Sequence, residues 1–294
     1  MVSFRASLCL TGCRKSGRAR SLARASALPD SMAKRPAPEP KVCIFCGRRP
    51  LTEEHIWPRW ASDLIPNAIG HRRFMLKGRH STPIMSVERD YNRQGPAKNL
   101  SVRRVCGDCN GGWMSDYEQE LRPLLTRLFS GDPVFILPAS RVRLVEYIAY
   151  KLLILDWLDD DPVIPSASAH AFYADRTLPP NLSILAFNCV EGSWRAGYRA
   201  HSFAATLVEE WPGHEIPPTA RSFAIGFGNF YLFAIISTLA NLPLQRKADL
   251  TIQLHPATEP GLLIWPPVQP INSKQAESIA SSFYRIQQEL LRVQ

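Results

Sequence analysis

No segment of this sequence is apolar for long enough to cross a membrane as a helix. The closest approach, residues 144–158, falls short of the roughly 18 residues that such a span needs and contains Glu146 and Lys151. The chain also lacks a glycine-rich phosphate-binding loop, a Ser-His-Asp order and an internal repeat. We therefore expect a cytoplasmic protein without membrane partners, and the search for a function turns to other motifs.

Acidic residues are scarce in the first 41 residues, which contain nine Lys or Arg against Asp30 and Glu39. This composition buries too little apolar surface to offset the entropy of chain ordering, so we expect a disordered extension. It resembles an organellar transit peptide in composition, but a second interpretation is simpler: the natural start is Met32 and the upstream residues are an over-extended start. Cys9 and Cys13 are then incidental.

Length and charge leave a wide choice of folds and partners. The 294 residues suffice for one large domain or two small ones. Of the net charge of +9, residues 1–41 supply +7, residues 42–122 supply +4 and the remainder supplies −2. A basic surface on 42–122 suits a polyanion such as nucleic acid, although ordinary solvated surface has a similar composition.

Four of the seven cysteines form two Cys-x-x-Cys pairs, Cys43 with Cys46 and Cys106 with Cys109. A single pair is also typical of redox motifs, but two pairs predict a closed four-thiolate site for a structural Zn²⁺ ion. Gly47 directly after the first pair permits the positive φ that a tight turn often needs. Because 59 residues separate the pairs, the metal would connect two segments that are distant in the chain.

Polar side chains beside the cysteines are candidates for chemistry. Glu54 and His55 lie between the two pairs, and Asn110 follows Cys109 directly. Histidine is suited to accepting a proton near neutral pH, and a carboxylate is a hard ligand for a divalent cation. Taken alone, Glu54 and His55 would be surface residues of a strand that ends at Pro58, and Asn110 would be a helix N-cap. Their place beside two metal-binding pairs favours a functional site.

Basic residues recur in the insert at 61–104, where Phe74 and Tyr91 are interleaved with them. This pattern suits a segment that follows a phosphate backbone and stacks on bases, and it equally suits a polar loop packed over the insert. After the second cysteine pair, apolar residues from Trp113 to Leu128 recur at helical spacing, and Pro123 is expected to kink or divide that helix.

The chain from residue 135 to residue 294 predicts a mixed α+β domain with a mainly antiparallel sheet. Helices are expected at 141–158, where the segment is buried, and at 275–290, where it is amphipathic. Gly228 and Asn229 are expected to form a two-residue hairpin turn. Strands are expected at 182–188, 195–204, 223–227, 230–237, 250–255 and 262–265.

The pattern Cys-x-x-Cys, acidic-His-x-x-Pro, Cys-x-x-Cys-Asn resembles the zinc-braced branch of the HNH endonuclease superfamily, also called His-Me finger or ββα-metal nucleases. The resemblance covers residues 43–118 and extends to uncharacterised bacterial HNH proteins with Cys-x-x-Cys-Asn-x-Gly-Trp-Met. It implies a treble-clef fold, with a β-hairpin and a helix around one metal, over a module at 42–130. It also implies His55 as the general base, Glu54 and Asn110 as ligands of a catalytic Mg²⁺ or Mn²⁺ ion, and the four cysteines as zinc ligands.

Two departures from the family pattern affect the expected cation site. The last His of the HNH pattern is missing, and Trp113 and Glu118 occupy that neighbourhood. Glu54 stands where Asp is commoner. Glu118 is therefore a candidate to complete the cation site, and the metal preference and the activity depend on how this replacement works.

The expected function is cation-dependent hydrolysis of phosphodiester bonds in DNA, with RNA left open as a substrate. An alternative is a catalytically inactive zinc module that binds nucleic acid or protein, which the missing His favours. A third is a two-domain scaffold with a purely structural zinc ion, which predicts no affinity for nucleic acid. The sequence does not indicate an oligomeric state.

Overall fold

The computed structural model describes residues 41–64, 69–79, 85–96, 101–157, 162–203, 220–238, 249–257 and 261–281. The expected extension up to residue 40 lies outside the described residues, as does the second half of the helix expected at 275–290. The segment Lys41–Gln294 forms one compact unit. Among the described residues, no helix combines the length and apolarity that crossing a bilayer requires.

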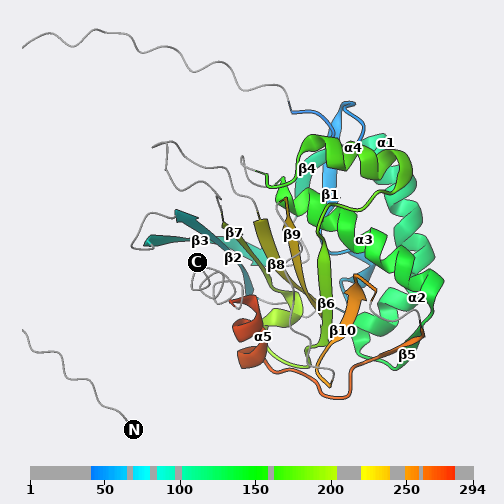
Figure 1. Cartoon of the computed structure of the whole chain (residues 1–294), viewed down its shortest axis with the longest axis vertical. Coiled ribbons are helices and arrows are strands. Elements are labelled where there is room, and N and C mark those ends of the chain that lie inside the picture. Colours follow the sequence, from blue (N-terminus) through cyan, green and yellow to red (C-terminus); the bar gives the residue numbers. More distant parts are fainter. Residues whose placement is uncertain are drawn as a thin grey trace, which may run out of the picture. The chain divides into compact units, whose positions relative to one another are not determined.

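Seven strands form the central sheet of this unit (Figure 1). They are β2 (Ile69–Arg79), β3 (Met85–Pro96), β6 (Ser183–Asn188), β7 (Tyr198–Phe203), β8 (Ala220–Phe227), β9 (Phe230–Ser237) and β10 (Ile252–His255). Their order is β10-β6-β9-β8-β7-β2-β3, and every neighbouring pair is antiparallel except β2 with β7. The expected mixed α and β composition and mainly antiparallel sheet are confirmed.

The hairpin of β8 and β9 turns at the two residues that the sequence predicts. Phe227 pairs with Phe230, so Gly228 and Asn229 alone form the connection. Gly228 has a φ of +60°, and a Cβ atom there would lie 2.4 Å from the backbone oxygen of Phe129. Only glycine combines this backbone conformation with this close approach, so the turn packs directly against the chain at Phe129.

The insert expected at 61–104 contains a long hairpin that extends the central sheet. β2 pairs with β3 from Ile69 opposite Pro96 to Arg79 opposite Met85, and its residues Met75–Gly78 pair in parallel with β7. The interpretation of this stretch as a polar loop is therefore wrong in part, because much of it is strand, and its binding of nucleic acid stays a prediction. The side chains of β2 and β3 lie outside the described part of the structure.

Helices cover both faces of the central sheet. They are α2 (Ser115–Ser130), α3 (Pro138–Asp156), α4 (Ser166–Asp175) and α5 (Ser273–Ala280). One core joins α2, α3 and α4 to sheet residues such as Ile184 and Leu232, and a second core joins α5 to the alternate residues Leu185 and Phe233. Figure 1 shows α2, α3 and α4 grouped on one side of the sheet and α5 on the other. The two-residue period of the strands thus separates two apolar layers.

Smaller elements complete the unit. They are the strands β1 (Leu51–His55), β4 (Ser101–Cys106), β5 (Val134–Ile136) and β11 (Leu263–Trp265), the short helix α1 (Gly107–Cys109), the π-helical turn η3 (Asn110–Met114) and the 3-10 turns Arg59–Ala61 and Ser193–Ala196. β1 pairs with β4 and β5 with β11, each as a separate antiparallel pair. The first core includes Cys43 and Trp57 as well as Leu153 and Phe230. The stretches expected as a zinc module and as an α+β domain therefore share one apolar core.

Helix α3 is fixed near both of its ends. Near its start, Arg141 donates from Nε and Nη2 to the carbonyl oxygens of Leu254 and Gln253, at 2.9 and 2.8 Å. At its end, the buried carboxylate of Asp156 lies 2.8 Å from the guanidinium of Arg221. Because α3 also passes through the first core, its inward-facing side chains have little freedom to move.

Candidate metal centre and adjoining charged site

A β-hairpin followed directly by a helix brings the two cysteine pairs together. β1 lies antiparallel to β4, with Leu51 opposite Cys106, and the chain continues from β4 into α1, η3 and α2 without a loop. The first pair lies just before β1, where the amide of Gly47 donates to the carbonyl of Cys43 at 2.9 Å. Gly47 has a φ of +71°, as its position after the pair predicts.

The four sulfur atoms of the two cysteine pairs lie within 4.8 Å of one another. The Sγ atoms of Cys43 and Cys109 are 3.8 Å apart, and those of Cys46 and Cys106 are 3.4 Å apart. A tetrahedral Zn²⁺ ion at about 2.3 Å from each sulfur requires sulfur–sulfur distances of about 3.8 Å. The predicted four-cysteine cluster is therefore present, with a geometry that suits a structural metal ion.

The protonation of these thiols is consistent with a site for a cation. Contact with Cys109 lowers the pKa of Cys43 to about 4, whereas the same contact raises the pKa of Cys109 far above its usual value. Burial raises the pKa of Cys46. One negative charge thus makes a second one costly within the cluster, and a divalent cation is needed for all four sulfurs to be thiolates.

Asn110 ties the start of the helical segment to β1. Its amide nitrogen donates to the backbone oxygen of Glu53 at 2.9 Å and to Oγ1 of Thr52 at 3.2 Å. Asn110 has helical backbone angles, so it is not the N-cap that the alternative interpretation required. Both hydrogen bonds use the nitrogen of the side chain, and they position the residue after the second cysteine pair against the strand that carries Glu54 and His55.

His55 is the last residue of β1 and lies opposite Ser101. Both of its ring nitrogens are buried, and neither has a hydrogen-bond partner among the described residues. The strand was expected to continue to Pro58, but it ends at His55 because Trp57 turns into the core and donates to the carbonyl of Gly226 at 2.6 Å. A buried imidazole without a partner is energetically unfavourable, so it requires an explanation such as a bound ligand or a reactive role.

Glu54 and Glu118 lie together, as the sequence predicts, but around a lysine that the sequence analysis did not identify. Lys151 of α3 donates from Nζ to Oε1 of Glu54, to Oε1 of Glu118 at 3.0 Å and to the backbone oxygen of His55 at 2.8 Å. Lys151 is 2% exposed and Glu54 is 6% exposed. One ammonium group thus joins β1, α2 and α3 in the interior.

The charges in this cluster support one another. Burial alone would lower the pKa of Lys151, but attraction to Glu54 and then to Tyr150 and Glu118 outweighs it and raises this pKa well above its usual value. Burial raises the pKa of the Glu54 carboxyl, and the neighbouring ammonium of Lys151 opposes that rise. Lys151 is therefore a permanent positive charge between two acidic side chains.

The residues expected to hold a catalytic divalent cation do not fit one in this arrangement. Mg²⁺ needs oxygen ligands at about 2.1 Å in near-octahedral geometry. The ammonium of Lys151 contacts the Oε1 atoms of both Glu54 and Glu118, so it occupies the position between them that a cation would need. A second positive charge between these carboxylates would be repelled by the first.

The space beside Lys151 is small. A cavity of about 10 Å³ lies next to it, lined also by Tyr147, Phe129 and Phe227. A cavity of this volume has room for about one water molecule, so it cannot accept a nucleotide.

Known protein families, curated proteins and solved structures were compared with this chain, and none of them matches it. The interpretation of the site therefore depends on the chemistry of its own residues. The four cysteines meet as predicted, Glu54 meets Glu118, and Asn110 contacts β1. Lys151 was missed because it lies 97 residues after Glu54, within an apolar run that indicates only a buried helix.

Proposed function

We propose that this protein is an HNH-type phosphodiesterase that acts on DNA, with RNA left open as a substrate. The observation that carries the proposal is the imidazole of His55, buried and without a hydrogen-bond partner in the described residues, at the end of a strand beside the four-cysteine cluster. A buried polar group of this kind calls for an explanation, such as a bound water molecule, a ligand or a catalytic role, and the proposal takes the last of these for His55. The proposal extends to a treble-clef fold for β1, β4 and the helical segment that follows them.

In the proposed reaction, His55 accepts a proton from water as the oxygen of that water forms a bond to phosphorus. The opposite P–O bond breaks, and the leaving oxygen takes a proton from solvent, so that a phosphomonoester and a hydroxyl end are produced. The four cysteines and their metal take no part in this chemistry. Their role is to hold β1 against the helical segment, so that His55 at the end of this strand is held in a fixed position.

Basic residues around the cluster support nucleic acid as the partner. Arg48, Arg49 and Arg103 are exposed on the cysteine turn and on β4. Arg48 lies 3.3 Å from Asp108 and Arg103 lies 3.1 Å from Glu53, both as exposed pairs. Exposed pairs of this kind are weak and exchange readily with phosphate oxygens.

Plasmid nicking tests the proposal. Wild-type protein with one Zn²⁺ per chain is incubated with supercoiled DNA, beside His55→Ala and the control His170→Ala, which changes an exposed histidine of α4. We expect nicking by the wild type and by His170→Ala, and none by His55→Ala. Equal nicking by all three would show that a contaminant or a different residue is responsible.

A second candidate function is supported by the contacts of Lys151. Since the carboxylates expected to bind a cation are bonded to an ammonium group, the module is also suited to binding nucleic acid or protein without cleaving it. This candidate predicts retention of a labelled DNA duplex in a gel-shift experiment while no nicking occurs under any divalent cation. Cleavage that depends on His55 would contradict it.

A further inference from the structure

We infer that Lys151 takes the place of a divalent cation between Glu54 and Glu118, and that this position therefore binds neither Mg²⁺ nor Mn²⁺. The two carboxylates come from β1 and α2, which are separate in the chain, and a buried positive charge from α3 lies between them. Two acidic side chains drawn to one point from different elements are typical of a cation site. Here the protein supplies the cation itself.

The hydrogen-bonding capacity of Lys151 is fully used. An ammonium group has three N–H donors, and Nζ has three acceptors: Glu54, Glu118 and the backbone oxygen of His55. No donor remains for a phosphate or a water molecule. Lys151 is therefore a positioning residue that fixes the end of β1, and it does not contact a substrate.

Displacement of Lys151 by a metal ion would be unfavourable. The side chain of Lys151 projects from α3, and this helix is fixed near both ends by the contacts of Arg141 and Asp156. Away from the carboxylates, the ammonium would meet the rings of Tyr147 and Tyr150, whose centroids lie 5.7 and 5.3 Å away, and a cavity of about 10 Å³. Aromatic rings attract a cation but do not replace two carboxylates and a carbonyl.

The inference has one consequence that rests on the proposed function. If His55 drives phosphodiester cleavage, then cleavage by the zinc-loaded protein proceeds without added Mg²⁺. The inference about Lys151 itself does not need cleavage, because cation binding can be measured without a substrate.

Binding of Mn²⁺, followed by electron paramagnetic resonance of the zinc-loaded protein, tests the inference. We expect Mn²⁺ to bind wild-type protein no more tightly than it binds Glu54→Gln. Lys151→Met removes the charge but keeps an unbranched side chain, and it should bind one Mn²⁺ ion per chain. The control Lys151→Arg keeps the charge and should bind none, and the double variant Glu54→Gln/Lys151→Met should lose the new site.

Two results would overturn the inference. The first is a Mn²⁺ site in the wild type that disappears in Glu54→Gln. The second is a folded, zinc-loaded Lys151→Met protein that binds no Mn²⁺. The comparison of wild type with Glu54→Gln leaves Lys151 unchanged, so exclusion of the cation is decided even if the Lys151 variants do not fold. Loss of nicking with unchanged Mn²⁺ results would count against the proposed function alone.

Discussion

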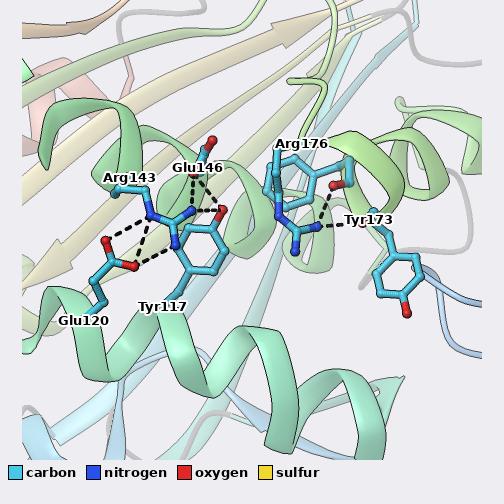
Figure 2. A network of polar contacts seen from close by, with 7 residues as sticks. Tyr117, Glu120, Arg143, Glu146, Tyr173 and Arg176 are labelled. Carbon is cyan, nitrogen blue, oxygen red and sulfur yellow. Dashed lines mark hydrogen bonds and ion pairs between the residues drawn. The ribbon is translucent and has the colours of Figure 1, made fainter. Parts of the chain in front are cut away.

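Two clusters of charge join α2 to α3, and they differ in depth. The first is the buried cluster of Glu54, Glu118 and Lys151. The second is the surface network of Tyr117, Glu120, Arg143 and Glu146, which Figure 2 shows between the two helices. The side chain of Lys151 is 2% exposed, whereas that of Arg143 is 36% exposed and that of Glu120 is 49% exposed.

The cation in each cluster suits its surroundings. Arg143 uses its planar guanidinium to contact both oxygens of Glu120, at 2.6 to 3.1 Å, as well as Glu146 and the hydroxyl of Tyr117. Its Cζ atom also lies 4.1 Å from the centre of the Tyr117 ring. Lys151 is a compact charge with three acceptors and an exposure of only 2%. Similar charges thus form a solvated contact in one place and a buried contact in the other.

The largest effect is expected at the four-cysteine cluster, which lies next to the strand that carries Glu54. Cys109→Ser removes one of four ligands, and structural zinc contributes free energy on the order of 10 kcal/mol to folding. We expect loss of zinc and of folded structure around β1, measured as zinc per chain and by thermal unfolding. Cys189→Ser is the control, because Cys189 is buried outside the cluster. Normal zinc content in Cys109→Ser would contradict the assignment.

Lys151→Ala tests the buried cluster directly. Removing the ammonium leaves the buried carboxylate of Glu54 and the partly exposed carboxylate of Glu118 without their cation, so we expect the free energy of unfolding to fall by about 3–5 kcal/mol. Urea denaturation measures this loss, and Lys274→Ala, an exposed lysine on α5, is the control. A loss as small as that of the control would show that the contacts of Lys151 with Glu54 and Glu118 do not stabilise the fold.

Arg143→Ala should cost less, since water replaces its partners. We expect the free energy of unfolding to fall by about 1 kcal/mol, and less in high salt. Arg143→Lys keeps the positive charge but loses the paired contacts with Glu120. Its stability therefore shows how much of the effect comes from the charge and how much from the planar guanidinium. Equal effects at Arg143 and Lys151 would remove the contrast between the two clusters.

The last effect is confined to alkaline pH. Burial and then the hydrogen bond to Glu146 raise the pKa of Tyr117 to about 12, against about 10 when it is unfolded. The folded phenol therefore stays protonated where the unfolded one ionises, and its stabilising contribution, complete below pH 10, is lost as the pH rises towards 12.

Tyr117→Phe checks this dependence on pH. The free energy of unfolding of wild type should decrease more steeply between pH 10 and 12 than that of the variant, measured by urea denaturation. Tyr173→Phe, a partly buried neighbour in α4, serves as the comparison. Parallel curves for wild type and Tyr117→Phe would contradict the pKa of Tyr117.

The sequence correctly predicted features that are determined by residues close together in the chain. The spacing of the cysteines predicted their cluster, the Gly228-Asn229 pair predicted the β8–β9 turn, and the apolar period predicted α2. Even there, Pro123 lies inside α2 without ending it, and α3 begins at Pro138 rather than at 141 because proline is suited to the first helical position.

Long-range pairings could not be predicted in the same way. β2 contacts β7 more than a hundred residues later, and no local pattern indicates that parallel pair. Lys151 looked like a lone charge within a buried helix, and only the fold shows that Glu54 and Glu118 surround it. The roles of His55, Glu54, Glu118 and Asn110 in catalysis stay predictions.

The insertion of β2 between β3 and β7 has a consequence for synthesis on the ribosome. At about 5–20 residues per second, roughly ten seconds pass between the emergence of β2 and that of β7. During that interval the cysteine cluster can already close, while one edge of the β2–β3 hairpin is without its neighbour. An unpaired edge is a template for association with other chains. The nascent protein is therefore open to such association until β7 pairs with β2.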